Sequence, residues 1–323
     1  MSGFSGGGFL KTSAFFICVH CFLCYNNIIL EDDTMDAFDL VPIKEIQCLD
    51  KGFVKLIDVM PRIIPEGQTC DYAIAQMARV SYGQGTKSVN EDKGLIRYLL
   101  RHNHTSPFEG IDFKLHMKMP IFIARQMIRH RTVSLNEISG RYSVMKDEFY
   151  IPDVEDLRKQ SKTNKQGGEE ILDKETSQEF VDKIDLSCKD AYSVYLQMLD
   201  AGVSREQARM VLPLNLYTEW YWKQNLHNLL HLLSLRADAH AQKEIRVYAD
   251  AILKLITPLV PYTIEAWNDY HPMRGAMKLT RLEVESLSQS LRDNVDQSKL
   301  SDICSDNKRE QTEWQQKIND FYE

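Results

Sequence analysis

Directional polar side chains are concentrated where an apolar segment, PIFIARQMI (120–128), ends. The next fifteen residues, RHRTVSLNEISGRYS (129–143), contain three arginines, a histidine, a glutamate and several hydroxyl groups. A guanidinium is planar, permanently charged and forked, so clustered arginines suit phosphate groups or carbonyl oxygens that gain negative charge during a reaction. Each arginine alone would be typical of an exposed helix end, where the helix dipole stabilises a cation. Their density favours a binding site for a phosphorylated ligand.

Two later segments carry similar side chains at helical spacing. Arg205 and Arg209 recur four residues apart in SREQARMVL (204–212), and Arg236 and His240 are also four apart. Residues at this spacing lie on one face of a helix. Cationic and polar groups from three separate segments could therefore meet around one ligand.

His227 and His231 raise the question of a metal site. Their H-x-x-x-H spacing matches two ligands on one helix face, but Asn228 stands where the metalloprotease motif has its glutamate. Zinc binding, the lining of a polar cavity and a helix-surface role all remain open, and the prediction for the protein as a whole is that it has no metal.

Nucleophilic and nucleotide-binding motifs are poorly supported. None of the seven cysteines lies between Cys70 and Cys188, and Ser139 is not set in a G-x-S-x-G elbow. A G-x-G-x-x-G fingerprint and a P-loop lysine are also missing. A metal-ligand interpretation of the cysteine cluster CVHCFLC (18–24) lacks a clear fourth ligand beyond His20. The odd, scattered cysteines favour a reducing compartment.

The composition is that of an ordinary globular protein. The chain has 323 residues, of which 43% are hydrophobic and 26% charged, with a net charge of −7. This acidic balance argues against broad nucleic-acid binding, which needs a basic surface. The apolar run 14–30 resembles a signal peptide or anchor in outline, but His20, Asn26 and Asn27 interrupt it. We expect an N-terminal extension without a stable membrane anchor.

The hydrophobic pattern predicts the elements around the arginine-rich segment 129–143. FVKLIDVMP (53–61) predicts a strand and DYAIAQMARV (71–80) a helix, and Ser88 with Glu91 forms a capping box for the next helix. After the loop NHTSPFEG (103–110), IDFKLHMKM (111–119) alternates as a half-buried strand does. Pro120 fits the first turn of a helix whose end delivers Arg129, His130 and Arg131.

The second half of the chain is richer in helices. We expect a polar insertion at 153–177, a helix over 178–200 that stops at Gly202, and a helix capped by Ser204 and Gln207. PLNLYTEWYW (213–222) predicts a strand, and 225–236 and 239–259 have helical periodicity. The resulting fold class is α+β (mixed α/β), not a doubly wound sheet.

At this point the residues resemble a known family. Arg129-His130-Arg131, seven residues and then Ser139 match the R-H-R-x7-S signature of the flavin-dependent thymidylate synthases, the ThyX family. The flanking segments HNHTSPFEG, REQARMVLPLNLYTEWYWKQN and LRADAHAQKEI extend the resemblance from about residue 51 to 267.

The resemblance implies an enzyme that makes dTMP from dUMP, with methylenetetrahydrofolate as one-carbon donor and NADPH reducing a bound FAD. It implies a central sheet flanked by long helices, in a homotetramer with shared active sites and no nucleic-acid partner. The domain would span 51–280, between an N-terminal extension (1–50), expected to be flexible, and a helical or disordered tail (281–323). The expected location is cytoplasmic, with organelle targeting by the extension left open.

The same resemblance assigns roles to individual residues. Arg236 would be catalytic, stabilising negative charge at the uracil N3/O4 edge so that C5 reacts without a thiolate. The residues expected around dUMP are Gln126, Arg129, Glu137, Ser139, Gly140, Arg141, Arg209 and Arg236. Those expected around FAD are Ser81, Ser106, Glu109, Arg129, His130, Arg131, Asn136, Glu137, Asn225, His227, His231 and His240. His104 would help to position folate or flavin. His227 and His231 depart from the family pattern, since some members have arginine and asparagine there.

Two other classes of protein remain as alternatives. A cysteine-dependent thymidylate synthase or another nucleotide methyltransferase would need a reactive thiol and no bound chromophore. A non-catalytic nucleotide- or RNA-phosphate-binding protein would use the arginine clusters for phosphate contacts alone, with steep salt dependence.

Overall fold

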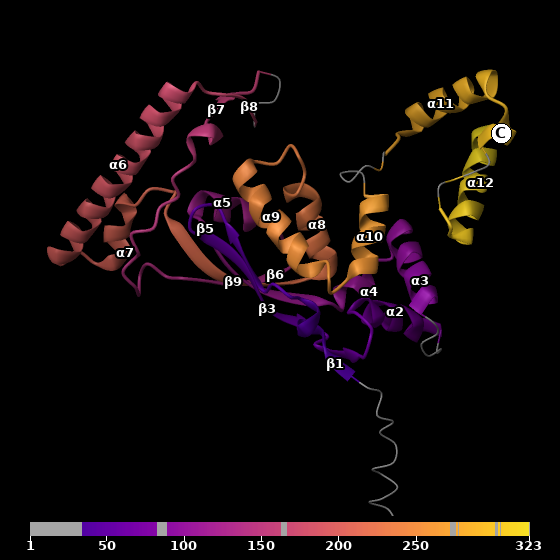
Figure 1. The fold of residues 1–323 in the computed structure, drawn as a ribbon, viewed down its shortest axis with the longest axis horizontal. Coiled ribbons are helices and arrows are strands. Elements are labelled where there is room, and N and C mark those ends of the chain that lie inside the picture. Colours follow the sequence, from indigo (N-terminus) through magenta and orange to yellow (C-terminus); the bar gives the residue numbers. More distant parts are fainter. Residues whose placement is uncertain are drawn as a thin grey trace, which may run out of the picture.

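A five-stranded antiparallel sheet forms the centre of the computed structural model, which describes residues 34–82, 89–162, 167–271, 276, 278–300, 303 and 305–322 (Figure 1). The strands, in spatial order, are β2 (Glu45–Cys48), β3 (Gly52–Met60), β5 (Asp112–Pro120), β9 (Tyr217–Asn225) and β6 (Val133–Glu137). Every neighbouring pair is antiparallel. The predicted mixed α/β class is thus confirmed.

The alternation along β5 decides which face of the sheet is buried. Phe113, Leu115, Met117 and Met119 are fully buried, whereas Lys114 between them is exposed. Since successive side chains of a strand point to opposite faces, the apolar set makes one continuous surface. The helices α5 (Ile121–Met127), α8 (Leu226–Arg236) and α9 (Lys243–Ile256) cover it.

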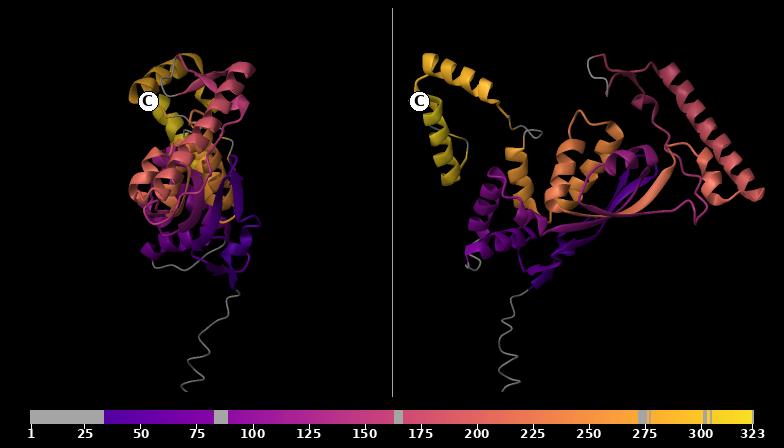
Figure 2. Two further views of the ribbon diagram at one scale, coloured as in Figure 1. Left: turned by 90° about the vertical axis from the view of Figure 1, so that its left-hand side faces the viewer. Right: turned by 180° about the vertical axis from the view of Figure 1, so that it is seen from behind.

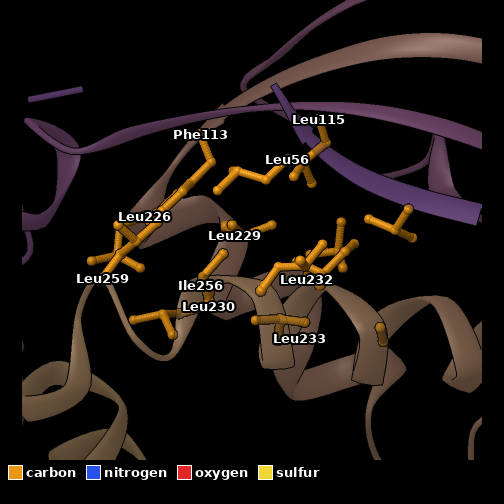
Figure 3. Packing of buried hydrophobic residues seen from close by; sticks show 14 of the residues in the cluster. Leu56, Phe113, Leu115, Leu226, Leu229, Leu230, Leu232, Leu233, Ile256 and Leu259 are labelled. Atoms are coloured by element: carbon orange, nitrogen blue, oxygen red, sulfur yellow. The ribbon is translucent and has the colours of Figure 1, made fainter. Parts of the chain in front are cut away.

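Close packing between the sheet and α8 holds that helix in place. Leu56 and Leu115, which are partners in the register of β3 and β5, face leucines of α8 such as Leu229 and Leu232 (Figure 3). All four side chains are at most 1% exposed. The sheet therefore fixes the position of the helix that ends in Arg236.

The N-terminal cap of α8 gives a first testable prediction. Asn225 accepts hydrogen bonds from the backbone N of Asn228 at 3.0 Å and from its Nδ2 at 2.8 Å. Replacing Asn225 with alanine should lower the free energy of unfolding by about 1 kcal/mol, because a helix N-terminal donor loses its acceptor. Urea denaturation measures this, with Asn225→Asp as the control that keeps an acceptor; equal stability of the alanine and wild-type proteins contradicts the assignment.

The folded body begins before residue 51. β2 pairs with β3, and β1 (Thr34–Asp36) pairs with β4 (Ile63–Pro65), so both lie within the segment expected to be a flexible extension. The pattern of β2 is mostly polar, with only Cys48 buried, so its sequence carries little strand signal. The apolar run 14–30 and its cysteines lie outside the described residues.

A helical group lies beside the sheet. It comprises α2 (Asp71–Arg79), the 3-10 turn η2 (Val80–Tyr82), α3 (Val89–Arg101), α4 (Ser106–Glu109) and α10 (Pro261–Tyr270). The helices expected at 71–80 and after residue 88 are present, although Ser88 itself lies outside the described residues. The segment SPFE, expected to be loop, forms the single turn α4, since Pro107 is tolerated in a first helical turn.

The insertion forms a short hairpin before a long helix. The described part contains η3 (Val154–Asp156), β7 (Arg158–Gln160) and β8 (Gly168–Ile171), followed by α6 (Lys174–Asp200). The helix begins four residues earlier than expected because Asp173 accepts a hydrogen bond from Thr176 N at 2.9 Å. Gly202, with φ +84°, ends it as expected.

Three element boundaries were wrong around the site. The predicted helix 204–212 is only α7 (Arg205–Ala208) plus the 3-10 turn η4 (Arg209–Val211). The predicted strand 213–222 begins at Tyr217, because residues 213–216 form a turn in which Leu216 N donates to Pro213 O. The predicted helix 239–259 begins at Lys243 and ends at Ile256, after a turn closed by Ala241 N and Asp238 O.

The C-terminal residues form α11 (Arg281–Asn294), η6 (Gln297–Leu300) and α12 (Lys308–Tyr322). Figure 2 shows that α11 and α12 lie at the opposite end of the molecule from α6 and α7. Across the described ranges, we find no helix long and apolar enough to cross a membrane.

Candidate functional site

Arg236 and His130 form the centre of one group of site residues, which we call the first cluster. Arg236 ends α8, and its Nε donates a hydrogen bond to Nε2 of His130 at 3.0 Å. His130 follows α5 and is only 7% exposed, and its ring lies 6.1 Å from that of His231. Two of the three segments singled out by the sequence therefore meet here.

The pKa values of the two side chains agree with a hydrogen bond in which Arg236 donates and His130 accepts. Burial, then the nearby Arg236 and His231, lower the pKa of His130 to about 4. The imidazole is thus neutral at pH 7, with an Nε2 lone pair that accepts from the guanidinium. Burial also lowers the pKa of Arg236, which nevertheless remains a cation. Within the described part of the chain we find no other hydrogen-bond partner for this guanidinium, so its remaining donors can serve a ligand.

A buried glutamine holds the arginine-rich turn. Gln224 on β9 is 1% exposed, donates from Nε2 to the carbonyl oxygen of Arg131 at 3.1 Å and accepts from Trp222 Nε1. Thr132 then adopts φ +58°, a left-handed conformation, before β6 begins. The side chains of Arg129 and Arg131 are left exposed. Gln224 was not predicted as a site residue, because it stands between the polar residues Lys223 and Asn225 and nothing in the local pattern marks it as buried.

The second cluster gathers around Gly140, beyond the other end of β6. A Cβ on Gly140 would lie 3.1 Å from Cδ of Arg209 and 3.0 Å from Sδ of Met145, so a larger residue would crowd both. Arg141 pairs with Glu206 at 3.2 Å, and its backbone N donates to Ser139 Oγ at 3.3 Å. The first and second segments therefore also meet, but at a different place.

Glu137 connects this second cluster to strand β9 of the sheet. Its Oε1 accepts from Thr218 Oγ1 at 2.6 Å, which ties the last residue of β6 to β9. Its neighbour Asn136 is exposed on the same strand. β6 was not predicted as a strand, because it is short, lies at the sheet edge and alternates only weakly.

Two cavities are lined in part by residues that the sequence predicts around the cofactor. One, of about 970 Å³, is lined by His104, His227 and His231 together with residues of α12. The other, of about 2080 Å³, is lined by His104, Ser81 and Ser106, among others. Ligand pockets typically measure about 300–1,000 Å³, so the first has the size of a small-molecule site and the second is larger than one small ligand requires. His104 lines both.

The remaining predicted residues have other contacts. Asn225 caps α8, Gln126 donates to Gln242 at 2.6 Å, and Glu109 is exposed on α4. His240, with its side chain 86% exposed, pairs with Asp238 at 2.9 Å instead of joining His231.

The two clusters are not joined within one chain. His130 precedes β6 and Gly140 follows it, and the strand alone spans about 13 Å at roughly 3.3 Å per residue. Neither of the two cavities is lined by Arg209 or by Arg236. Among the described residues we also find no group of three or more His, Cys, Asp or Glu that could hold a metal ion, so His227 and His231 gain no third ligand.

Arginine, imidazole and amide groups brought together by α8, the turn after α5 and strand β9 are typical of a site for a phosphorylated ligand with a hydrogen-bonding ring. Comparison with known proteins narrows this class. A family model described as thymidylate synthase complementing protein matches residues 62–262. The chain therefore belongs to the flavin-dependent thymidylate synthase family.

Similar proteins are found in distant organisms. The chain is 53% identical over 273 residues to a flavin-dependent thymidylate synthase of Dictyostelium discoideum, covering 84% of this chain and 86% of that protein. It is 52% identical over 258 residues to one of Thermus thermophilus, covering 80% and 90%.

Solved structures agree with the fold. The UMP/dUMP methylase PolB of Streptomyces cacaoi, bound with 5-Br dUMP, is similar with a TM-score of 0.60 and 33% identity. The match covers 70% of this chain and 98% of that one.

Proposed function

We propose that this protein methylates dUMP to dTMP, using methylenetetrahydrofolate as one-carbon donor, a bound FAD, and NADPH as reductant. Family membership establishes the class of enzyme. The observation that carries the assignment to this chain's own residues is the Arg236–His130 contact, in which the His130 ring lies 6.1 Å from the ring of the cavity-lining His231. It presents a partly desolvated cation with free donors where a uracil ring could meet a flavin.

The residues present fit FAD. Its two phosphates require cations or N–H donors, and Arg129 and Arg131 leave exposed guanidinium groups beside His130. His104, His227 and His231 line a cavity of suitable size. Each ring can donate a hydrogen bond, although His227 and His231 stand where some members of the family have arginine and asparagine. We assign Ser81, Ser106 and Glu109 to the same cofactor. When bound, the flavin supplies the reducing electrons for the new methyl group.

The second cluster fits a nucleoside monophosphate. Arg141 and Arg209 offer guanidinium groups for a phosphate, Gly140 allows close approach, and Ser139 adds a hydroxyl. Arg141 would exchange its exposed ion pair with Glu206 for the ligand, at little cost because exposed pairs contribute about 0–1 kcal/mol. Arg236 would stabilise the negative charge that develops on the uracil ring, so that C5 attacks without thiolate addition.

A homotetramer would bring the two clusters together. Each cluster is incomplete alone, and large apolar side chains are exposed near the second: Tyr142 (77%), Met210 (70%) and Leu214 (65%). Their contact with partner subunits would bury this surface and place one subunit's Arg209 near another's Arg236. We also propose a cytoplasmic location and a division into an extension, a catalytic domain that includes β1 and β2, and a tail.

The described cysteines argue against a thiol mechanism and give a prediction. Burial raises the pKa of the Cys48 and Cys70 thiols to about 12, and that of Cys188 is also raised by burial. None of these three would form a thiolate near pH 7. Cys188→Ser should therefore leave kcat for dTMP formation within about twofold of wild type. Complete loss of turnover in a folded variant would support the cysteine-dependent alternative.

Gly140 gives a prediction for the substrate site. In Gly140→Ala the new Cβ crowds Arg209 and Met145, so we expect the Kd for dUMP to rise about fivefold. Titration calorimetry measures this. Gly94→Ala on α3 is the matched control, since its nearest atom would lie at 4.0 Å. An unchanged Kd in Gly140→Ala would remove Gly140 from the dUMP site.

An absorption spectrum of the purified protein tests the proposed function directly. We expect a visible flavin band that bleaches anaerobically with NADPH, and dTMP formation when dUMP and methylenetetrahydrofolate are added. A protein that cannot take up FAD, yet binds RNA with a steep salt dependence, would instead be the non-catalytic phosphate-binding protein.

A further inference from the structure

The C-terminal helix α12 is attached to the catalytic body by a network of ion pairs. Glu310 accepts from Arg97 Nε at 2.6 Å and from Arg101 Nη1 at 3.1 Å. Glu313 accepts from Arg101 Nε at 2.7 Å and Nη2 at 2.8 Å, a bidentate pair. Both arginines belong to α3, more than 200 residues earlier in the chain. The helix therefore has a specific place on the body.

This attachment is more than a surface contact. Glu310 is 7% exposed and also accepts from the hydroxyl of Tyr270. Burial alone would raise the pKa of Glu310, but hydrogen bonds from Arg97 and Tyr270 outweigh it and hold the pKa at about 2. Hydrogen bonds from Arg101 likewise lower the pKa of Glu313 to about 2. Since both lie below the ordinary value near 4.5, the attachment is intact at neutral pH and is lost only as the pH falls through about 2.

The attached helix lines the cavity that we assign to the cofactor. Trp314 and Lys317 of α12 line the same cavity as His104, His227 and His231. Trp314 is itself held, because its Nε1 donates to the carbonyl oxygen of Leu300 at 2.8 Å. Lys317 is exposed, so its ammonium is available to a ligand. The match to the family model ends at residue 262, so this wall lies outside the matched region.

The geometry points to α12 as an additional wall of the FAD site, in which Lys317 supplies a cation to a cofactor phosphate and the helix slows cofactor release. This inference rests on the proposed function. A phosphate is its natural ligand, because Lys317 brings an ammonium to a cavity that is also lined by imidazole donors, and the carboxylates of Glu310 and Glu313 are already paired with Arg97 and Arg101.

An inhibitory role for α12 predicts the opposite change in the affinity for FAD. The carboxylates of α12 occupy two guanidinium groups, Arg97 and Arg101, that line the same cavity. If the tail served only to occupy them, its release would expose two cations and FAD would bind more tightly. The sign of the change in affinity therefore decides between a wall and an inhibitory segment.

Flavin fluorescence titration of full-length variants measures that sign. The double variant Glu310→Gln/Glu313→Gln releases α12 and should raise the Kd for FAD about tenfold, and Lys317→Ala should raise it about fivefold. Asp320→Asn is the matched control, since it removes an exposed carboxylate of the same helix that, among the described residues, accepts a hydrogen bond from Gln316 alone. An unchanged or lower Kd in both variants overturns the inference.

A second measurement uses the unaltered chain, in case the double variant does not fold. By linkage, a ligand that is retained by α12 must stabilise α12 in return. FAD should therefore slow tryptic cleavage after Lys317, and an unchanged cleavage rate at saturating FAD overturns the inference. If the wild-type protein does not bind FAD at all, the proposed function is wrong. If it binds FAD but α12 does not change the affinity for FAD, the proposed function stands and only the inference about α12 is wrong.

Discussion

Replacing Arg236 with alanine should lower kcat for dTMP formation by about 10²–10³-fold while FAD remains bound, because one preorganised donor to developing charge is lost. Arg236 ends α8 and has one recorded hydrogen bond, to His130, among the described residues. Its other N–H groups are available to the uracil edge. Single-turnover kinetics measure the chemical step, and the flavin spectrum reports cofactor content.

The controls for Arg236 separate catalysis from charge and folding. Arg281→Ala removes an exposed arginine whose one ion pair, within the part of the chain that the structure describes, is with Glu285 of α11, and it should retain full activity. Arg236→Lys keeps the positive charge but loses the planar fork, so it should recover only part of the rate. Full activity in Arg236→Ala would exclude this residue from the catalytic role.

Replacing His130 with leucine should lower kcat by about 10–100-fold, because Arg236 loses the acceptor that orients it and small displacements at a reacting centre are costly. His130→Gln, whose Oε1 can accept from Arg236 Nε, should restore most of the rate. A merely structural role for His130 predicts instead that both variants lose activity in proportion to their loss of stability, measured by urea denaturation.

The pH dependence provides an independent check of His130. Its pKa of about 4 lies below the ordinary value of 6.5, so the folded state favours the neutral ring. This contribution to stability is fully present above pH 6.5 and is lost as the pH falls through about 4. The imidazole signals of the folded protein, followed by NMR, should therefore include one histidine that stays neutral at pH 5.5; a His130 that titrates near 6.5 contradicts the buried contact.

Local patterns predicted the elements that bury one face. Phe113, Leu115, Met117 and Met119 alternate along β5, and all are fully buried, because a strand's two-residue period places them on one face whatever the partner. Gly202 ends α6 for an equally local reason, its positive φ. Errors arose where the local signal was weak, as in the edge strand β6 or the turn at 213–216.

The sequence by itself determined the residue types available for chemistry, the buried alternation of the central strands and membership of the family, since each is a property of neighbouring residues or of a matched motif. Tertiary structure decided which of those residues meet. His130 and Arg236 are 106 positions apart, and Glu310 lies 213 residues from Arg97. Sheet register and helix packing bring such distant residues into contact, so a periodic pattern of neighbouring residues cannot predict them. The separation of the Gly140 and Arg236 clusters likewise became visible only in the folded chain.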